Sequence, residues 1–208
     1  GGIYCGGASP TIANNTITHN SSTQGGGVFC KASSCTIRDN EIRDNTASDS
    51  GGGIYCIDAS PGIFRNLIHG NSADDGGGCG FANSAPTLVS NAITENKALQ
   101  DGGALVFGGS SAPTVVNNTF VGNQAAAGGA IYCSNGCSPT VANCIFASNE
   151  ATHGGCAYRE TGSALGFAYC FFHANGGEPF YPASWNPVAT NGNRDDDPLF
   201  LAPWVGEY

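Results

Sequence analysis

Apolar and polar positions alternate in short runs that return at a fixed spacing along the chain. Paired or triple glycines recur at Gly1, Gly25, Gly51, Gly76, Gly102, Gly128 and Gly154, a spacing of 24 to 26 residues. Each glycine group is followed by an apolar triplet, a polar turn, and then two further apolar runs separated by asparagine. Three apolar runs per period, each bounded by turn residues, predict three short β-strands rather than a helix.

Alignment of the periods gives four apolar columns, two of them from the first strand. These columns are Ile3, Val28, Ile54, Cys79, Leu105, Ile131 and Ala157; Cys5, Cys30, Cys56, Phe81, Phe107, Cys133 and Arg159; Ile12, Ile37, Ile63, Leu88, Val115, Val141 and Phe167; and Ile17, Ile42, Ile68, Ile93, Phe120, Phe146 and Phe172. Each coil can bury such side chains only against its neighbours. We therefore expect an all-β fold, a right-handed parallel β-helix or single-stranded solenoid of about seven coils of 25–26 residues.

Asparagines form two further columns at the polar turns. They are Asn15, Asn40, Asn66, Asn91 and Asn118, and Asn20, Asn45, Asn71, Asn96, Asn123, Asn149 and Asn175. Asparagine tolerates left-handed backbone at a tight turn, and stacked amides can hydrogen-bond along a ladder. Both columns therefore predict turn structure rather than a functional site.

The repeat divides the chain into coils at residues 1–175 and a different segment at 176–208. The second segment contains Phe180, Tyr181, Trp185 and Trp204, and we expect a partial last coil and a C-terminal cap, since a solenoid needs its terminal strands covered. The chain starts inside a coil, which makes end-to-end self-association, including fibre formation, a further expectation.

Several motifs resemble those of a known repeat family. GGAL at 102–105, GGAI at 128–131 and F-x-x-N at 120–123, 146–149 and 172–175 resemble repeats of chlamydial polymorphic outer-membrane proteins and of the wider right-handed parallel β-helix repeat family. The segment Asp197-Pro198-Leu199-Phe200 resembles the closing element of bacterial secreted β-helix proteins. The resemblance implies the fold and export, but not the chemistry, because the same coil carries adhesins, surface-layer proteins, lyases and glycosidases.

Composition adds constraints on location and partners. The chain has 10 Cys, no Met and a net charge of -9. The negative charge disfavours nucleic acid, and no apolar run is long enough to insert into a membrane within this segment. Ten cysteines without paired C-x-x-C motifs favour disulfides in an oxidising, extracellular or cell-surface location.

Three cysteine pairs are disulfide candidates. Cys133 with Cys137 and Cys30 with Cys35 each bracket a short turn, whereas Cys144 lies one coil from Cys170. Side chains stacked between coils keep their Cβ atoms slightly too far apart for easy bonding. We therefore expect the turn-closing pairs first and free thiols in the column of Cys5, Cys30 and Cys56. No metal site is expected from the scattered histidines.

Two columns could form a working surface. An aromatic column, Tyr4, Phe29, Tyr55, Tyr132 and Tyr158, alternates with the inward columns and is expected to point outward, where its rings could bind sugars or stabilise neighbouring strands. The second column consists of threonines and suggests ice binding, although its outward neighbours would interrupt a regular plane. Its members are Thr11, Thr36, Thr87, Thr114 and Thr140.

A charged patch on coils two to four is the candidate catalytic centre. It contains Arg43, Asp44, His69 and Glu95, beside Arg38, Asp39, Glu41 and Arg65. Polysaccharide lyases on this fold use a basic residue beside acidic calcium ligands, and glycosidases use clustered carboxylates. Ion pairs between coils explain the same residues without a substrate.

Acidic residues in the turns suggest that the protein binds calcium. They are Asp49, Asp74, Asp75 and Asp101, with Asp195, Asp196 and Asp197 near the end, but their spacing matches no known calcium loop. No other cofactor is expected.

The short, uniform turns argue against a deep catalytic cleft. We expect a non-catalytic secreted or cell-surface β-helix used for structure, adhesion or contact with a polysaccharide or cell-surface glycan. The alternatives are a polysaccharide lyase or glycoside hydrolase, and a fibre-forming or ice-binding solenoid.

Overall fold

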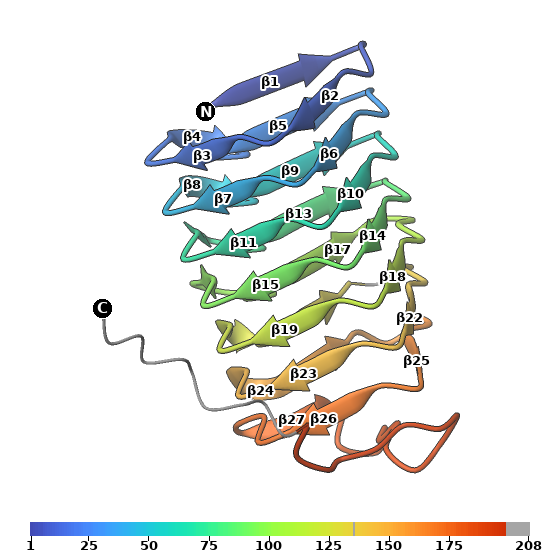
Figure 1. Cartoon of the computed structure of the whole chain (residues 1–208). Coiled ribbons are helices and arrows are strands. Elements are labelled where there is room, and N and C mark those ends of the chain that lie inside the picture. The colour runs from blue at the N-terminus through green and yellow to red at the C-terminus, as the bar shows by residue number, and fades with distance from the viewer. Residues whose placement is uncertain (135, 199–208) are drawn as a thin grey trace.

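The computed structural model describes residues 1–134 and 136–198, which form a parallel β-helix whose coils stack along one axis (Figure 1). Each strand pairs in parallel with its equivalent in the next coil, so that Ile3 lies beside Val28 and Val28 beside Ile54. Two of the sheets hold seven strands each, one strand per coil. The expected all-β solenoid of about seven coils is confirmed.

The strands fall on four sides of the coil. The first side contains β1 (Ile3–Gly6), β5 (Val28–Lys31), β9 (Ile54–Ile57), β13 (Cys79–Ala82), β17 (Leu105–Gly108) and β21 (Ile131–Cys133). The second contains β2 (Thr11–Ala13), β6 (Thr36–Arg38), β10 (Gly62–Phe64), β14 (Thr87–Val89), β18 (Thr114–Val116), β22 (Thr140–Ala142) and β25 (Gly166–Ala168). The third contains β3 (Thr16–Thr18), β7 (Glu41–Arg43), β11 (Leu67–His69), β15 (Ala92–Thr94), β19 (Thr119–Val121), β23 (Ile145–Ala147) and β26 (Phe171–His173).

A fourth set of strands departs from the three expected per coil. It contains β4 (Ser21–Gln24), β8 (Thr46–Ser50), β12 (Ser72–Ala73), β16 (Lys97–Ala98) and β20 (Gln124–Ala127). In the sixth coil β24 (Glu150–Arg159) runs from this side into the first, so both sides belong to one sheet. These strands consist mainly of polar residues and alanine and contain no large apolar side chain, which is why apolar runs did not predict them.

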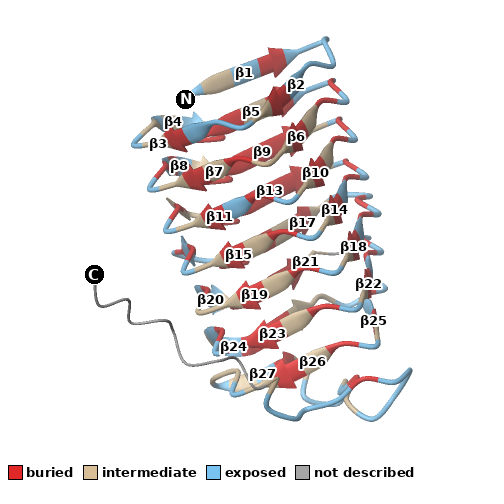
Figure 2. Ribbon diagram, viewed as in Figure 1, coloured by how far each residue is buried: buried red, intermediate tan, exposed pale blue. Residues whose placement is uncertain are grey.

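The core lies inside the coils and follows the four apolar columns (Figure 2). Aromatic rings extend the stack between coils: the ring centroids of Phe120 and Phe146 are 4.7 Å apart, and those of Phe146 and Phe172 are 5.5 Å apart. Glycine is required where the fourth side bends into the first. At Gly51, φ is 70° and a Cβ atom would lie 2.3 Å from the Ile54 carbonyl oxygen.

Both asparagine ladders are present and mostly buried. The Nδ2 group of Asn71, for example, donates to Ile42 O at 2.9 Å and to Asn96 Oδ1 at 3.0 Å. Left-handed backbone falls on the residue before each ladder asparagine and not on the asparagine itself: φ is 56° at Asp39 and 53° at Asp44. The expected role of asparagine in adopting that conformation is therefore wrong, and its role is to satisfy buried backbone groups.

The segment expected to be a partial coil and cap begins with β27 (Glu178–Tyr181), which pairs with β24. After β27 the chain crosses the end of the core, where the Trp185 ring lies 5.8 Å from those of Phe167 and Phe180. Asn193 Oδ1 accepts a hydrogen bond from Cys170 N at 2.8 Å. Leu199, Phe200 and Trp204 lie outside the described residues.

Candidate functional site

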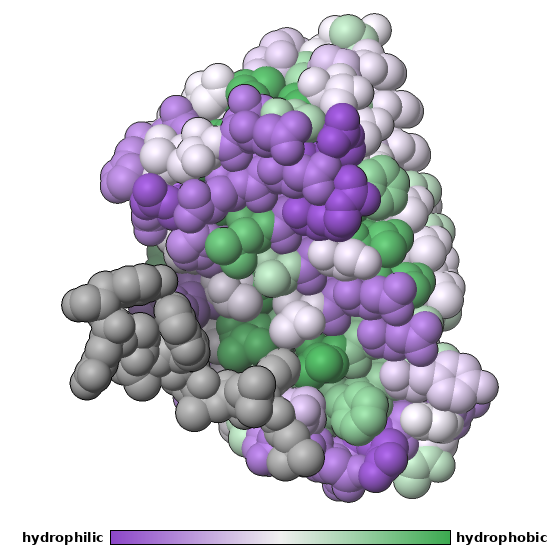
Figure 3. Space-filling model, in the orientation of Figure 1, coloured by the Kyte–Doolittle hydropathy of each residue, from purple (hydrophilic) through white to green (hydrophobic). Residues whose placement is uncertain are grey.

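The charged patch lies over the second and third sides, and Figure 3 shows a cluster of hydrophilic residues in the upper half of this face. Asp39 sits at its centre, between Arg38 and Arg65, with which it forms ion pairs. Arg65 donates to Asp39 from Nε at 2.7 Å and from Nη2 at 2.9 Å, and Arg38 donates from Nη1 at 2.7 Å. These bonds from Arg65 and Arg38 lower the pKa of the Asp39 carboxyl.

The proposed catalytic residues of the patch are also engaged with one another. Arg43 contacts Glu41 at 3.2 Å and Asp44 at 2.7 Å, and His69 Nε2 lies 3.3 Å from Glu41 Oε1. Glu95 lies two coils from Asp44, and Gly70 occupies the equivalent position between them. The structure therefore brings Arg43, Asp44 and His69 together around Glu41 but leaves Glu95 outside this group.

The aromatic column lies on the first side, and its rings differ widely in exposure. Tyr4 is 66% exposed, whereas Tyr55 and Tyr132 are only 7% and 8% exposed. A Cβ atom at Gly80 would lie 2.9 Å from Tyr55 Cδ2, so the ring of Tyr55 covers that glycine. Strand alternation gives the direction of a side chain but not the neighbour that it packs against.

A second stack of tyrosines occupies the last coils of the same side. The rings of Tyr132 and Tyr158 are 4.9 Å apart, and those of Tyr158 and Tyr181 are 4.5 Å apart. Tyr181 was missed because it follows the last regular period. Gly80 and Val106 separate this stack from Tyr4, Phe29 and Tyr55.

Two carboxylates meet beside the buried Tyr132. The Tyr132 hydroxyl donates to Glu160 Oε1 at 2.7 Å. Burial, followed by the carboxylates of Asp75 and Glu160, raises the pKa of Asp101 to about 6, and the Tyr132 hydroxyl opposes that rise. Burial and the bond to Glu160 raise the pKa of Tyr132 itself. This group was missed because Glu160 belongs to no column of the repeat.

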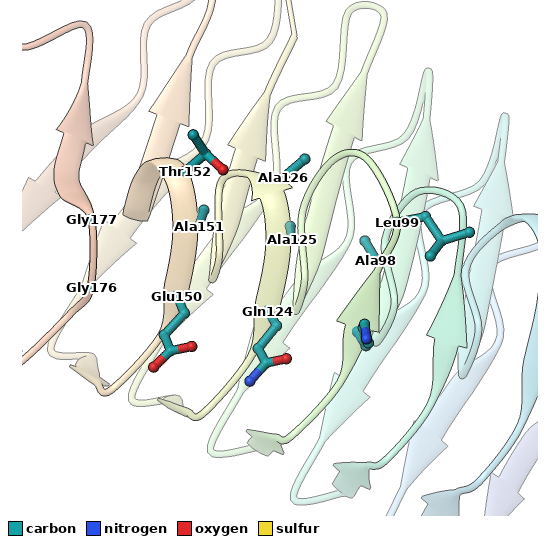
Figure 4. Close-up of a pocket in the computed structure, with 11 residues that line it drawn as sticks. Ala98, Leu99, Gln124, Ala125, Ala126, Glu150, Ala151, Thr152, Gly176 and Gly177 are labelled. Carbon is teal, nitrogen blue, oxygen red and sulfur yellow. The ribbon is translucent and has the colours of Figure 1, made fainter.

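A shallow groove of about 560 Å³ crosses β16, β20 and β24 on the fourth side. In Figure 4 the side chains of Gln124 and Glu150 project on one side of it, Leu99, Ala126 and Thr152 lie on the other, and small alanines lie between. Lys97 continues the column of Gln124 and Glu150. Within residues 1–134 and 136–198, no hydrogen bond or ion pair engages the side chains of Lys97, Gln124 and Glu150. They differ in this respect from the paired charges of the patch.

The acidic turn residues have partners of their own. Asp49 accepts from Gln24 Nε2 at 2.8 Å, Asp75 Oδ1 accepts from Asp101 N at 3.1 Å, and Asp196 forms an ion pair with Arg194. In the described part of the chain, no three carboxylates bring their oxygens together as calcium ligands. Calcium therefore remains a prediction without geometric support.

One of the three candidate disulfides is formed, between Cys133 and Cys137. Cys30, Cys35, Cys144 and Cys170 are buried free thiols. Cys144 replaces asparagine in its ladder, and its sulfur accepts a hydrogen bond from Asn118 N at 3.4 Å.

The model of a family described as right handed beta helix region matches residues 1–172. No curated protein and no solved structure matches the chain. Among the residues that the structure describes, none belongs to a helix able to cross a membrane.

Proposed function

The chain belongs to the right-handed β-helix family, and from that premise we propose a non-catalytic extracellular or cell-surface protein that contacts a polysaccharide or glycan. The observation that carries the proposal is the groove on the fourth side, where polar side chains without partners border a floor of small residues. The Cys133–Cys137 disulfide supports an oxidising location.

The chemistry of the groove suits a sugar chain. Lys97 offers a charged donor, Gln124 a donor and an acceptor, and Glu150 an acceptor, on three successive coils. Parallel strands space these groups about 4.8 Å apart, close to the rise of one sugar unit along an extended chain. Because the three side chains have no protein partners to give up, a ligand can engage them without breaking existing bonds.

A glycan array tests the proposal with matched variants. We expect the protein to retain a defined set of glycans, and both Gln124→Ala and Glu150→Ala to weaken that binding at least tenfold. Thr46→Ala is the control, since Thr46 is an exposed member of the same column outside the groove. Retention of no glycan, or equal binding by all variants, would contradict the proposal.

A second candidate, cleavage of a polysaccharide, is favoured by Asp101. A carboxyl with a pKa of about 6, held near Glu160 and the Tyr132 hydroxyl, is suited to act as a general acid. Reproducible cleavage of an acidic polysaccharide would replace the non-catalytic proposal. Loss of that activity in Asp101→Asn but not in Arg43→Ala would locate the centre here, whereas the reverse would locate it in the charged patch.

A further inference from the structure

Four buried thiols gather inside the first three coils. Cys5, Cys30 and Cys56 belong to β1, β5 and β9 and occupy one inward column in register. Cys35 lies just before β6 and faces the same interior. Cys5 is 4% exposed and the other three are fully buried.

Cys35 occupies a position that is proline in five other coils. The ladder sets this equivalence, because Thr36 N donates to Pro10 O at 2.9 Å and Gly62 N donates to Cys35 O at 3.0 Å. The remaining prolines of the column are Pro61, Pro86, Pro113 and Pro139. Cys35 therefore places a thiol where the other coils have the apolar ring of proline. This position lies where the first and second sides of the coil converge on the cysteine column.

The sulfur positions suit one shared ion better than a set of disulfides. The Sγ atoms of Cys5, Cys30 and Cys35 all lie within 4.8 Å of one another, whereas Cys56 lies one coil further along the column. Sulfur ligands about 2.3 Å from a tetrahedral ion are separated by roughly 3.8 Å, so a small contraction brings them into range. A Cys30–Cys35 bond would engage only two of these three thiols.

The three thiols are buried, so their thiolate form needs a cation to compensate its charge. A bound cation offsets the desolvation of thiolates, and soft sulfur ligands select thiophilic metals.

We propose that Cys5, Cys30 and Cys35 form a binding site for one thiophilic d10 metal ion, with Zn²⁺ as its probe. Binding forms three sulfur–metal bonds and releases the three thiol protons to solvent, and water completes the tetrahedral coordination. The site was not expected from the sequence because Cys35 is outside the cysteine column, and only the cross-section of the coil brings it there. The inference does not depend on the proposed glycan contact.

Metal titration of the full chain tests the site. Protein is prepared anaerobically without reductant, so that Cys133–Cys137 remains bonded, and is titrated with Co²⁺ and then with Zn²⁺. We expect an intense near-ultraviolet thiolate-to-cobalt absorption that saturates at one ion per chain and disappears on addition of Zn²⁺.

Cys35→Pro is the decisive variant, because the ladder bond at this position uses the carbonyl group, which proline retains. We expect it to keep the β-sheet circular dichroism spectrum and to weaken Co²⁺ binding at least tenfold, and Cys5→Ala to behave alike. Cys144→Asn removes a buried thiol elsewhere and restores the asparagine of its column, so it should bind as the unmodified chain does. Absence of the absorption, its persistence in Cys35→Pro, its loss in Cys144→Asn, or a Cys30–Cys35 disulfide found by peptide mapping would each overturn the site.

Discussion

Replacing Asn96 with alanine should destabilise the protein strongly, because its amide joins three coils. Asn96 Nδ2 donates to Ile68 O at 2.9 Å and to Asn123 Oδ1 at 3.1 Å. Its Oδ1 accepts from both N and Nδ2 of Asn71 at 3.0 Å. Alanine removes all of these bonds and leaves the buried Asn71 N–H without its acceptor.

The expected loss is about 3–4 kcal/mol in the free energy of unfolding. An orphaned buried N–H accounts for about 1–3 kcal/mol, and the other bonds contribute roughly 1 kcal/mol each before partial relaxation. Urea denaturation followed by circular dichroism measures the change as a shift in midpoint at constant slope. Gln124→Ala removes an exposed amide without partners and should change stability by less than about 0.5 kcal/mol. A loss below about 1 kcal/mol for Asn96→Ala would refute the assignment of stability to the ladder.

Two further substitutions test the first side of the helix. The pKa of Asp101 is raised to about 6, so the folded state binds more protons than the unfolded state between about pH 4 and 6, and stability should fall as the pH rises through that window. Asp101→Asn should abolish this fall and stabilise the protein at pH 7 by about 1 kcal/mol. The pKa shift alone implies roughly 3 kcal/mol, but solvent screens a half-exposed carboxyl and reduces the effect. Parallel pH profiles of stability for the two proteins would contradict this prediction. Gly80→Ala should destabilise by about 1–2 kcal/mol, mainly by displacing the Tyr55 ring, because the added Cβ atom would lie 2.9 Å from Tyr55 Cδ2 and 3.3 Å from Gly51 N. The loss should shrink in a Tyr55→Ala background, where an undiminished loss would show that the ring is not the cause.

The apolar columns predicted the fold because a solenoid core depends only on which residues recur. Ile37, Ile42 and Ile63 are fully buried at the positions that the spacing assigned to the interior. The fourth strand was missed because its residues are polar or alanine, as in β16 and β20, and lack the large apolar side chains that mark the other strands.

The candidate sites were predicted less well, since they depend on contacts between columns. The sequence brought Arg43, Asp44 and His69 to one face, but pairing of these charges with Glu41 and with one another could be seen only in three dimensions. The groove carries no motif at all, because alanine and glycine create it by leaving space. The disulfide partners Cys133 and Cys137 were suggested by a short turn, which is a local property.

The parallel register also has a consequence for how such a molecule changes over generations. Backbone bonds join each position to its equivalent one period away, as when Gly51 N donates to Asp75 O and Gly76 N to Asp101 O. Recombination that deletes or duplicates a single period therefore rejoins matching positions and preserves the cross-section on both sides of the junction. The length of the surface therefore becomes adjustable in whole steps without a new loop.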